Sequence, residues 1–352
     1  MTNKPIFLWC VMTSNRGDKA IRTSITRSLH KYCDAPVAYF NIKFDEITEQ
    51  RIEQINKEAS LLLIGGSGLY TNYKTSSGWY FPCKTELFDK IKVPIVLIGI
   101  GCNNNLIDDL YGNLTEKTKQ SIKKINELAI LSSVRDRRTY DILTDLGVTK
   151  HSLIPDPALF LEIPKIKKEK QVAINISQHI PLLGRYDGRQ DIREKNILIF
   201  SQLIKKLYTI GYKVVFIAHD ALEQSIINEL KKEVSELSYI NIDNIDLMLQ
   251  EYAKSEFSIG IRMHSNILSM AVNTPFIAIA YDQKSIEFCK LFNLPTPLNV
   301  VTYTYEELDK LCKFFIQYNK LDEKVLFLKN WYKEVYNYFI QRVVGYASQN
   351  GY

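Results

Sequence analysis

Residues 257–284 read FSIGIRMHSNILSMAVNTPFIAIAYDQK, and this stretch decides the fold. Positions 257–261 form a short apolar run suited to a buried strand, while Ile267, Leu268 and Ala271 recur at helical spacing. A second apolar run follows the helix. Strand, helix and strand in this order are typical of a parallel sheet that is covered by helices.

The same alternation continues through the rest of the chain, which predicts two α/β domains with Rossmann-like sheets facing a cleft. Three prolines and the charged stretch 165–170 interrupt the pattern. We therefore expect an N-terminal domain over 1–165, a C-terminal domain over 166–321 and a terminal helix over 322–352. Strands are expected over 6–12, 38–40, 61–65, 95–100, 130–134, 152–154, 172–177, 214–218, 240–242, 257–261 and 276–281. Helices are expected over 18–32, 46–57, 116–128, 140–146, 194–209, 222–234, 246–254, 265–272 and 285–291.

Composition excludes several classes of protein. Of 352 residues, 46% are hydrophobic and 11% aromatic, which excludes a disordered chain. The net charge of +6 is spread along the sequence without a long basic run. It indicates mild attraction to acidic substrates or to an anionic membrane face, and no nucleic-acid partner.

Cysteine spacing and hydropathy predict a cytoplasmic protein without a metal site. The six cysteines include no close pair, which argues against a zinc site or a redox pair. The apolar run over 6–12 is too short for a signal peptide, and no segment approaches the roughly 20 apolar residues that span a bilayer. The aromatic terminal helix either packs across its own protein, here onto the first domain, or makes peripheral contact with the inner membrane face.

Arg262 and His264 are expected in the turn that joins strand 257–261 to the next helix. Ligands of parallel sheets bind at the carboxyl ends of strands, where helix N-termini attract anions. A permanent cation beside a titratable imidazole indicates an anionic ligand that undergoes proton transfer. The alternative is a structural arginine in a salt bridge and a histidine that only packs.

Further candidate ligand turns follow strands of the first domain. In the turn over 14–18, Asp18 is expected either to cap the next helix or to act as a carboxylate in the cleft. The turn Gly65-Gly66-Ser67-Gly68 lets a ligand approach backbone N–H groups, although its spacing fits neither a dinucleotide fingerprint nor a P-loop.

Two other charged turns follow strands. Arg135 precedes a helix whose positive end disfavours it, so either Asp136 or a bound anion compensates its charge. His219 and Asp220 follow strand 214–218, as a capping pair or as ligand contacts. The turns at strand ends in both halves together favour a binding cleft.

These motifs resemble the polysaccharide pyruvyl transferase family. The resemblance implies the two-domain architecture of B-type glycosyltransferases, with the acceptor on the first domain and the donor on the second. It further implies transfer of the pyruvyl unit of phosphoenolpyruvate to a sugar, usually as a cyclic ketal. The motifs that carry it are Asn15-x-Gly17-Asp18, Gly65-Gly66, Val134-Arg135-Asp136, Pro155-Asp156-Pro157-Ala158 and the segment from Gly260 to Lys284.

The resemblance also implies roles for individual residues. Arg135 and Arg262 match the family's phosphoenolpyruvate-binding arginines, and His264 matches its active-site histidine, either as proton donor or as phosphate ligand. Asp18 is a candidate base. The further substrate-binding candidates are Met263, Asn15, Gly66, Ser67, His219 and Lys284.

The implied partners are phosphoenolpyruvate, as a substrate with no cofactor or metal beside it, and a sugar on a polysaccharide or a lipid-linked precursor. Aromatic residues of the loop over 69–82 are expected either to stack on the acceptor sugar or to pack; they are Tyr70, Tyr73, Trp79 and Tyr80. Two other functions remain open at this point. They are a nucleotide-sugar glycosyltransferase with the same two-domain fold and an anion-binding protein without activity.

Overall fold

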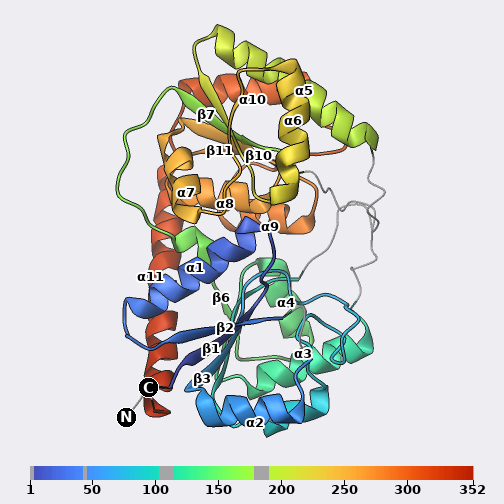
Figure 1. The fold of residues 1–352 in the computed structure, drawn as a ribbon, viewed down its shortest axis with the longest axis vertical. Coiled ribbons are helices and arrows are strands. Elements are labelled where there is room, and N and C mark those ends of the chain that lie inside the picture. Colours follow the sequence, from blue (N-terminus) through green and yellow to red (C-terminus); the bar gives the residue numbers. More distant parts are fainter. Residues whose placement is uncertain (1–3, 43–45, 103–113, 178–189, 352) are drawn as a thin grey trace.

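Two α/β domains make up the chain, and each is built on a six-stranded parallel sheet. The computed structural model describes residues 4–42, 46–102, 114–177 and 190–351. Figure 1 shows the two sheets one above the other, with helices packed around each of them. The predicted fold class, two Rossmann-like domains, is confirmed.

The first domain contains strands β1 (Ile6–Cys10), β2 (Val37–Asn41), β3 (Leu61–Gly65), β4 (Ile95–Ile100), β5 (Leu131–Val134) and β6 (Ser152–Leu153). Its helices are α1 (Arg16–His30), α2 (Glu49–Glu58), α3 (Glu116–Leu128) and α4 (Arg137–Asp145), with 3-10 turns η1 (Thr85–Lys90) and η3 (Pro157–Phe160). The strand order β2-β1-β3-β4-β5-β6 reverses its winding between β1 and β3. Strands β1, β3 and β4 are buried throughout, because helices cover both faces of a parallel sheet.

The second domain contains strands β7 (Gln171–Asn175), β8 (Lys213–Ile217), β9 (Ser238–Ile240), β10 (Phe257–Gly260), β11 (Phe276–Ala280) and β12 (Leu298–Asn299). Its helices are α5 (Gln190–Thr209), α6 (Gln224–Glu233), α7 (Ile245–Lys254), α8 (Met263–Ala271), α9 (Gln283–Leu291) and α10 (Tyr305–Gln317), with the 3-10 turn η4 (Ala221–Glu223). The strand order β12-β11-β10-β7-β8-β9 reverses its winding between β7 and β10.

Several elements differ from the sequence predictions in existence or bounds, among them α10 and α4. Helix α10 was not predicted, although Thr304 and Glu307 form a reciprocal capping box at its start. Helix α4 begins at Arg137, three residues before the predicted start, because the Asp136 side chain accepts a hydrogen bond from the Thr139 N–H and caps the helix.

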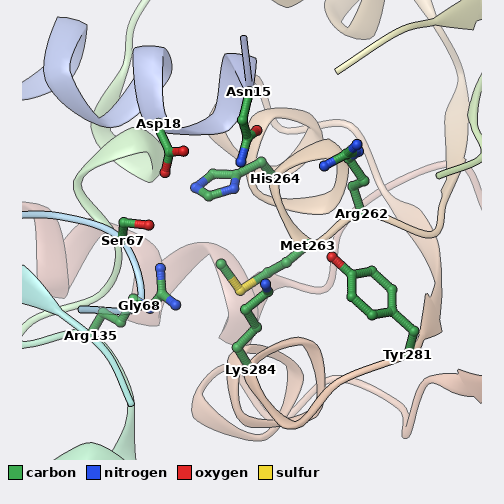
Figure 2. Close-up of a pocket in the computed structure, with 10 residues that line it drawn as sticks. All are labelled: Asn15, Asp18, Ser67, Gly68, Arg135, Arg262, Met263, His264, Tyr281 and Lys284. Atoms are coloured by element: carbon green, nitrogen blue, oxygen red, sulfur yellow. The ribbon is translucent and has the colours of Figure 1, made fainter. Parts of the chain in front are cut away.

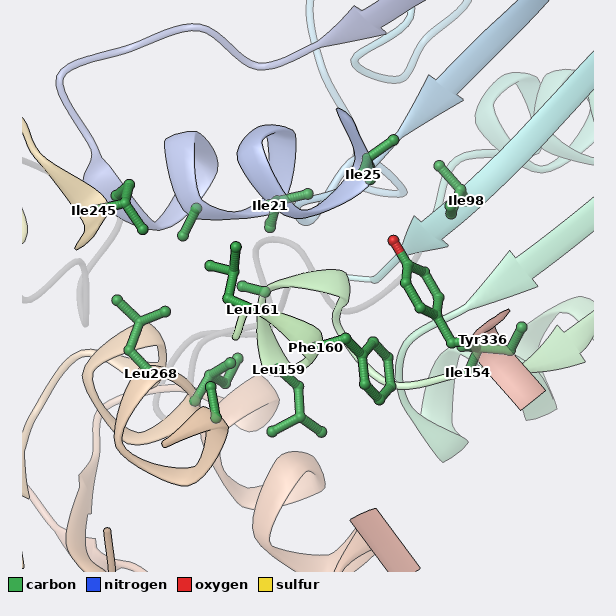
Figure 3. Packing of buried hydrophobic residues seen from close by; sticks show 14 of the residues in the cluster. Ile21, Ile25, Ile98, Ile154, Leu159, Phe160, Leu161, Ile245, Leu268 and Tyr336 are labelled. Carbon is green, nitrogen blue, oxygen red and sulfur yellow. The ribbon is translucent and has the colours of Figure 1, made fainter. Parts of the chain in front are cut away.

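The two domains share one apolar core. Figure 3 shows α1, which carries Ile21 and Ile25, above η3 with Leu159 and α8 with Leu268, and all four side chains belong to one cluster. Polar contacts also cross between the domains, since the Arg16 N–H donates to the His219 carbonyl at 2.8 Å. The start of α1 is therefore held directly against the second domain.

Helix α11 (Glu323–Gln349) extends along both domains (Figure 1). Near its start, the buried Lys329 ammonium donates to the carbonyls of Met270 and Ala271, which end α8. Further along, Tyr336 stacks on Phe160 of the first domain, with ring centroids 4.5 Å apart. The helix thus connects the end of α8 to the first domain.

Candidate active site

The candidate site is a small pocket where loops at the carboxyl ends of both sheets meet. These loops include those after β1 and β3 in the first sheet and the one after β10 in the second, beside the points where each sheet reverses its winding. Open parallel sheets bind ligands at such points. Figure 2 shows the lining residues, which are Asn15, Asp18, Ser67, Gly68, Arg135, Arg262, Met263, His264, Tyr281 and Lys284.

Arg262 occupies the N-cap position of α8, and His264 lies in the first turn of this helix. The prediction that both residues lie in a loop was therefore wrong for His264. The Ser265 hydroxyl donates to the Arg262 carbonyl at 2.6 Å, and the Arg262 N–H donates to the Asn175 side chain at 3.2 Å. These bonds fix the backbone where α8 begins, so the imidazole is held by a helix.

The Arg262 guanidinium is held by two acidic side chains of the second domain. Its Nε donates to the buried Glu223 carboxylate, and its Nη2 lies 4.0 Å from Asp220 Oδ2. Burial alone would lower the pKa of Arg262, but Glu223, Tyr281 and Asp220 raise it above its ordinary value. The side chain therefore stays cationic. Its Nη1 makes no hydrogen bond with any residue that the structure describes.

The Arg135 guanidinium enters from the first domain, and Figure 2 shows it opposite Arg262. Its Nη1 donates to Asp156 Oδ2 at 3.1 Å, and its Nε lies 3.8 Å from Asp136 Oδ2. Burial opposes the ionisation of Asp156, but neighbouring His264 and Arg135 lower the pKa of this carboxyl below its ordinary value. Asp156 is therefore an anion that positions the arginine.

The His264 imidazole lies between the two arginines, against the first turn of α1 (Figure 2). Its Nε2 is 3.5 Å from Asp156 Oδ2. This buried nitrogen has no hydrogen-bond partner among the described residues. The ring lies so close to Gly17 that a Cβ at that position would be 2.2 Å from Nδ1. A glycine is required there, because any side chain would displace the imidazole.

Asp18 also faces the pocket, from the first turn of α1. The interpretation of Asp18 as the helix cap is wrong, because Asn15 is the N-cap and accepts from the Gly17 N–H. Asp18 Oδ2 accepts from the Thr13 hydroxyl at 3.3 Å. The other oxygen, Oδ1, is buried without a hydrogen-bond partner among the described residues.

Lys284 and Tyr281 complete the wall on the side of the second domain. The Lys284 ammonium lies 2.9 Å from Asp282 Oδ2. Burial opposes its charge, but Asp282 and Tyr281 raise the pKa of Lys284 above its ordinary value, so it stays cationic. Tyr281 was not predicted as a site residue, although it directly follows β11 and the strand-end rule would have identified it.

Two predicted substrate-binding residues lie outside the pocket wall. His219 is fully buried, and its Nε2 is 2.8 Å from the Tyr252 hydroxyl, so the structure does not bring it to the pocket. A Cβ at Gly66 would meet the Ile21 side chain, so this glycine faces α1, whereas the neighbouring Ser67 lines the pocket. Within the described ranges, no cluster of three or more His, Cys, Asp or Glu side chains has a geometry that holds a metal ion.

The aromatic residues of the loop over 69–82 separate into two groups. Tyr70 and Trp79 are fully buried, and Tyr70 accepts a hydrogen bond from the Asn126 amide. Tyr73 is exposed and stacks on Tyr80, with ring centroids 4.1 Å apart. Tyr70 and Trp79 therefore pack in the core of the first domain, whereas Tyr73 and Tyr80 form a stacked aromatic pair in the chain segment that follows Gly68.

A family model for polysaccharide pyruvyl transferase matches residues 15–283, a range that includes nine of the ten lining residues. The chain belongs to the polysaccharide pyruvyl transferase family. The resemblance predicted from the sequence is thus confirmed. A related protein, the amylovoran biosynthesis protein AmsJ of Erwinia amylovora, is 24% identical over 285 residues. This region covers 72% of the chain but 64% of AmsJ, so the match spans less than two thirds of that relative's length.

Solved structures similar to this family member include two proteins that differ widely from it in sequence. The MnaA–UDP co-structure from S. aureus has a TM-score of 0.56 at 13% identity, covering 93% of this chain and 90% of that chain. The UDP-GlcNAc 2-epimerase from Methanocaldococcus jannaschii has a TM-score of 0.54 at 8% identity, covering 88% and 92%. At these identities the likeness shows the fold alone, and it confirms the predicted B-type architecture.

Proposed function

We propose that this protein transfers the pyruvyl group of phosphoenolpyruvate to a sugar of a polysaccharide or of its lipid-linked precursor. One observation carries the proposal. Arg135 of the first domain and Arg262 of the second face a single pocket, and the His264 imidazole, with its Nε2 3.5 Å from Asp156 Oδ2, lies between them. Membership in the polysaccharide pyruvyl transferase family supports the same reaction.

The donor fits the charges of the pocket. Phosphoenolpyruvate carries a carboxylate and a phosphate, and a guanidinium can bond two oxygens of either group at once. Lys284 adds a third cation, and α1, α8 and α9 direct their positive N-terminal ends toward the same space. We assign one anionic group to each arginine, and no cofactor or metal takes part in the scheme.

The proposed reaction begins with a proton transfer. His264 delivers it to the methylene carbon C3 of phosphoenolpyruvate, which leaves an oxocarbenium-like centre at C2. A sugar hydroxyl attacks C2 and loses its proton, for which Asp18 is the candidate base. The C2–O bond to phosphate then breaks, phosphate departs with the electron pair, and a second sugar hydroxyl closes the ketal and releases its proton.

The acceptor is assigned to the first domain. The exposed Tyr73, which stacks on the half-buried Tyr80, follows the pocket residues Ser67 and Gly68 in the chain and offers an aromatic face to a sugar ring. Tyr73→Ala is expected to raise the acceptor KM and to leave the phosphoenolpyruvate KM unchanged.

A turnover experiment tests this function. The purified protein is incubated with phosphoenolpyruvate and a panel of lipid-linked and synthetic galactosides, mannosides and N-acetylhexosamines, and both phosphate release and the mass of the sugar are followed. We expect phosphate release that depends on one acceptor, together with a product of the mass of a pyruvyl ketal. Thermal stabilisation by a nucleotide sugar, with no turnover of phosphoenolpyruvate across the panel, would refute the proposal in favour of a glycosyltransferase.

A further inference from the structure

A stripe of exposed aromatic residues runs along the solvent face of α11. Phe327, Trp331 and Tyr338 are 70%, 51% and 64% exposed, and their spacing of four and seven residues places them on one side of the helix. Large aromatic side chains are costly to leave in water, and a contiguous exposed group of them marks an interaction surface. Neither the pocket nor the proposed reaction uses them.

An apolar groove of about 690 Å³ opens beside the start of this stripe. Its walls are the beginning of β11, the segment 292–298, the end of α10 and the first residues of α11. Phe314 and Tyr318, which are 52% and 61% exposed, stand at the α10 wall. Lys324 lines the groove and lies three residues before Phe327 on the same side of α11, so groove and stripe form one surface.

Between 310 and 342 the chain carries seven lysines and arginines against three acidic residues. Lys329 is buried, and Lys313 and Lys333 are paired with Asp309 and Glu162, so Lys320 and Lys324 supply the positive charge beside the groove. Lys320 and Lys324 line the groove and form no ion pair with any residue that the structure describes. Asp322, an acidic residue of the same wall, already accepts the Lys324 N–H as the cap of α11.

We propose that this surface docks on an anionic phospholipid bilayer, with the aromatic stripe at headgroup level and one lipid hydrocarbon chain in the groove. Tryptophan and tyrosine prefer this level of a membrane, and lysines beside them are attracted to anionic headgroups. A symmetric contact with a second copy would instead bring the same unpaired lysines together, which disfavours that occupant. Within the described residues no helix is long and apolar enough to cross a membrane, so the contact is peripheral.

The docking surface lies close to the pocket. Phe276 and Ala278 of β11 line the groove, while Tyr281, just after the same strand, lines the pocket. At about 3.3 Å per residue, Phe276 and Tyr281 at the two ends of this segment are roughly 17 Å apart. A docked protein would therefore hold its pocket near the membrane surface, where a lipid-linked sugar resides.

Tryptophan fluorescence gives a direct test that requires no substrate, so its outcome is independent of the proposed function. Of the three tryptophans, Trp9 and Trp79 are fully buried and Trp331 is exposed, so a change on adding lipid reports on Trp331. We expect vesicles that contain phosphatidylglycerol to shift the emission to the blue and to sediment the full chain. Vesicles of phosphatidylcholine alone should do so weakly, and high salt should reverse the effect.

Variants locate the contact. Phe327→Ser should weaken vesicle binding about tenfold. The Lys320→Glu, Lys324→Glu double variant should weaken it at least about twentyfold, because each lysine near an anionic surface strengthens binding about fivefold. Leu198→Ser, which changes a residue 58% exposed on α5, serves as the matched control and should bind like the unaltered chain. The proposal is overturned if anionic vesicles cause no shift and no sedimentation. Equal binding of the patch variants and the control would also overturn it, as would a dimer that Phe327→Ser dissociates in the absence of lipid.

Discussion

Replacing Gly17 by alanine tests how closely the fold positions His264. The added Cβ would lie 2.2 Å from His264 Nδ1 and 2.4 Å from Cγ, about 1.2 Å short of the 3.4 Å at which ordinary contact begins. The backbone at Gly17 is restrained, because the preceding Arg16 N–H donates to the His219 carbonyl across the domain boundary. The imidazole therefore has to move by about 1 Å.

A displacement of about 1 Å in a reacting group lowers the rate roughly 100-fold. We expect Gly17→Ala to reduce kcat by about that factor and to leave the phosphoenolpyruvate KM nearly unchanged, because both arginines keep their partners. Overpacking should also lower the free energy of unfolding by about 1–3 kcal/mol. Steady-state phosphate release and urea unfolding measure the two effects.

Two comparisons make the Gly17 result specific. Gly345→Ala places a Cβ in open space on α11, so it should preserve kcat and stabilise the protein by up to about 1 kcal/mol. In the Gly17→Ala, His264→Ala double variant the ring is absent, so the stability cost of alanine at Gly17 should largely disappear. An unchanged kcat in Gly17→Ala, or a stability cost that persists without the ring, would refute the contact.

Three further changes test the surroundings of the pocket. Gly101→Ala places a Cβ 2.3 Å from Arg135 Nε, so it should displace the guanidinium and raise the phosphoenolpyruvate KM at least about tenfold in initial-rate measurements. An unaltered KM would contradict the role of Arg135 in donor binding. Asp156→Asn removes the charge-assisted bond to Arg135, which contributes about 1.5–3 kcal/mol. It should lower kcat/KM about 10- to 150-fold and change the pH profile of the reaction. An unchanged pH profile would mean that Asp156 has only a structural role. Burial and, to a smaller extent, neighbouring cations lower the pKa of His219 well below its ordinary value. Below about pH 6.5 the unfolded chain therefore binds a proton that the folded chain does not, and the free energy of unfolding falls as the pH falls. His219→Gln should remove about 1.4 kcal/mol of this loss per pH unit below about pH 6.5, as measured by urea unfolding, and an identical pH dependence would count against a neutral buried imidazole.

Much of the fold is predictable because a parallel sheet buries both of its faces. The runs 61–65 and 95–100 are continuously apolar for this reason, and the predicted strands match β3 and β4 in both bounds. Short edge elements such as β12 carry no comparable signal, since two residues form no periodic pattern.

The sequence predicts which strand ends line the candidate pocket, but not the side chains that hold the lining residues in place. Strand ends identify Arg135, Arg262 and His264, because parallel strands present their carboxyl ends at one edge. The strand-end rule gives no side-chain direction, and His219 at the end of β8 turns into the core. Glu223, which holds Arg262 from 39 residues away, has no sequence signal of its own, because only the folded chain brings the two together.

Titration of phosphoenolpyruvate into the protein tests the central claim most directly, namely that one arginine from each domain binds the two anionic groups of this donor. Calorimetry on the unaltered chain should show one site, and Arg135→Gln and Arg262→Gln should each weaken binding by about 10- to 150-fold, since each loses a bond to a charged group of about 1.5–3 kcal/mol. A matched Arg137→Gln variant, which removes an exposed arginine paired with Asp141, should bind like the unaltered chain. Binding that neither Arg135→Gln nor Arg262→Gln changes, or no binding of phosphoenolpyruvate beside clear binding of a nucleotide sugar, would contradict the account.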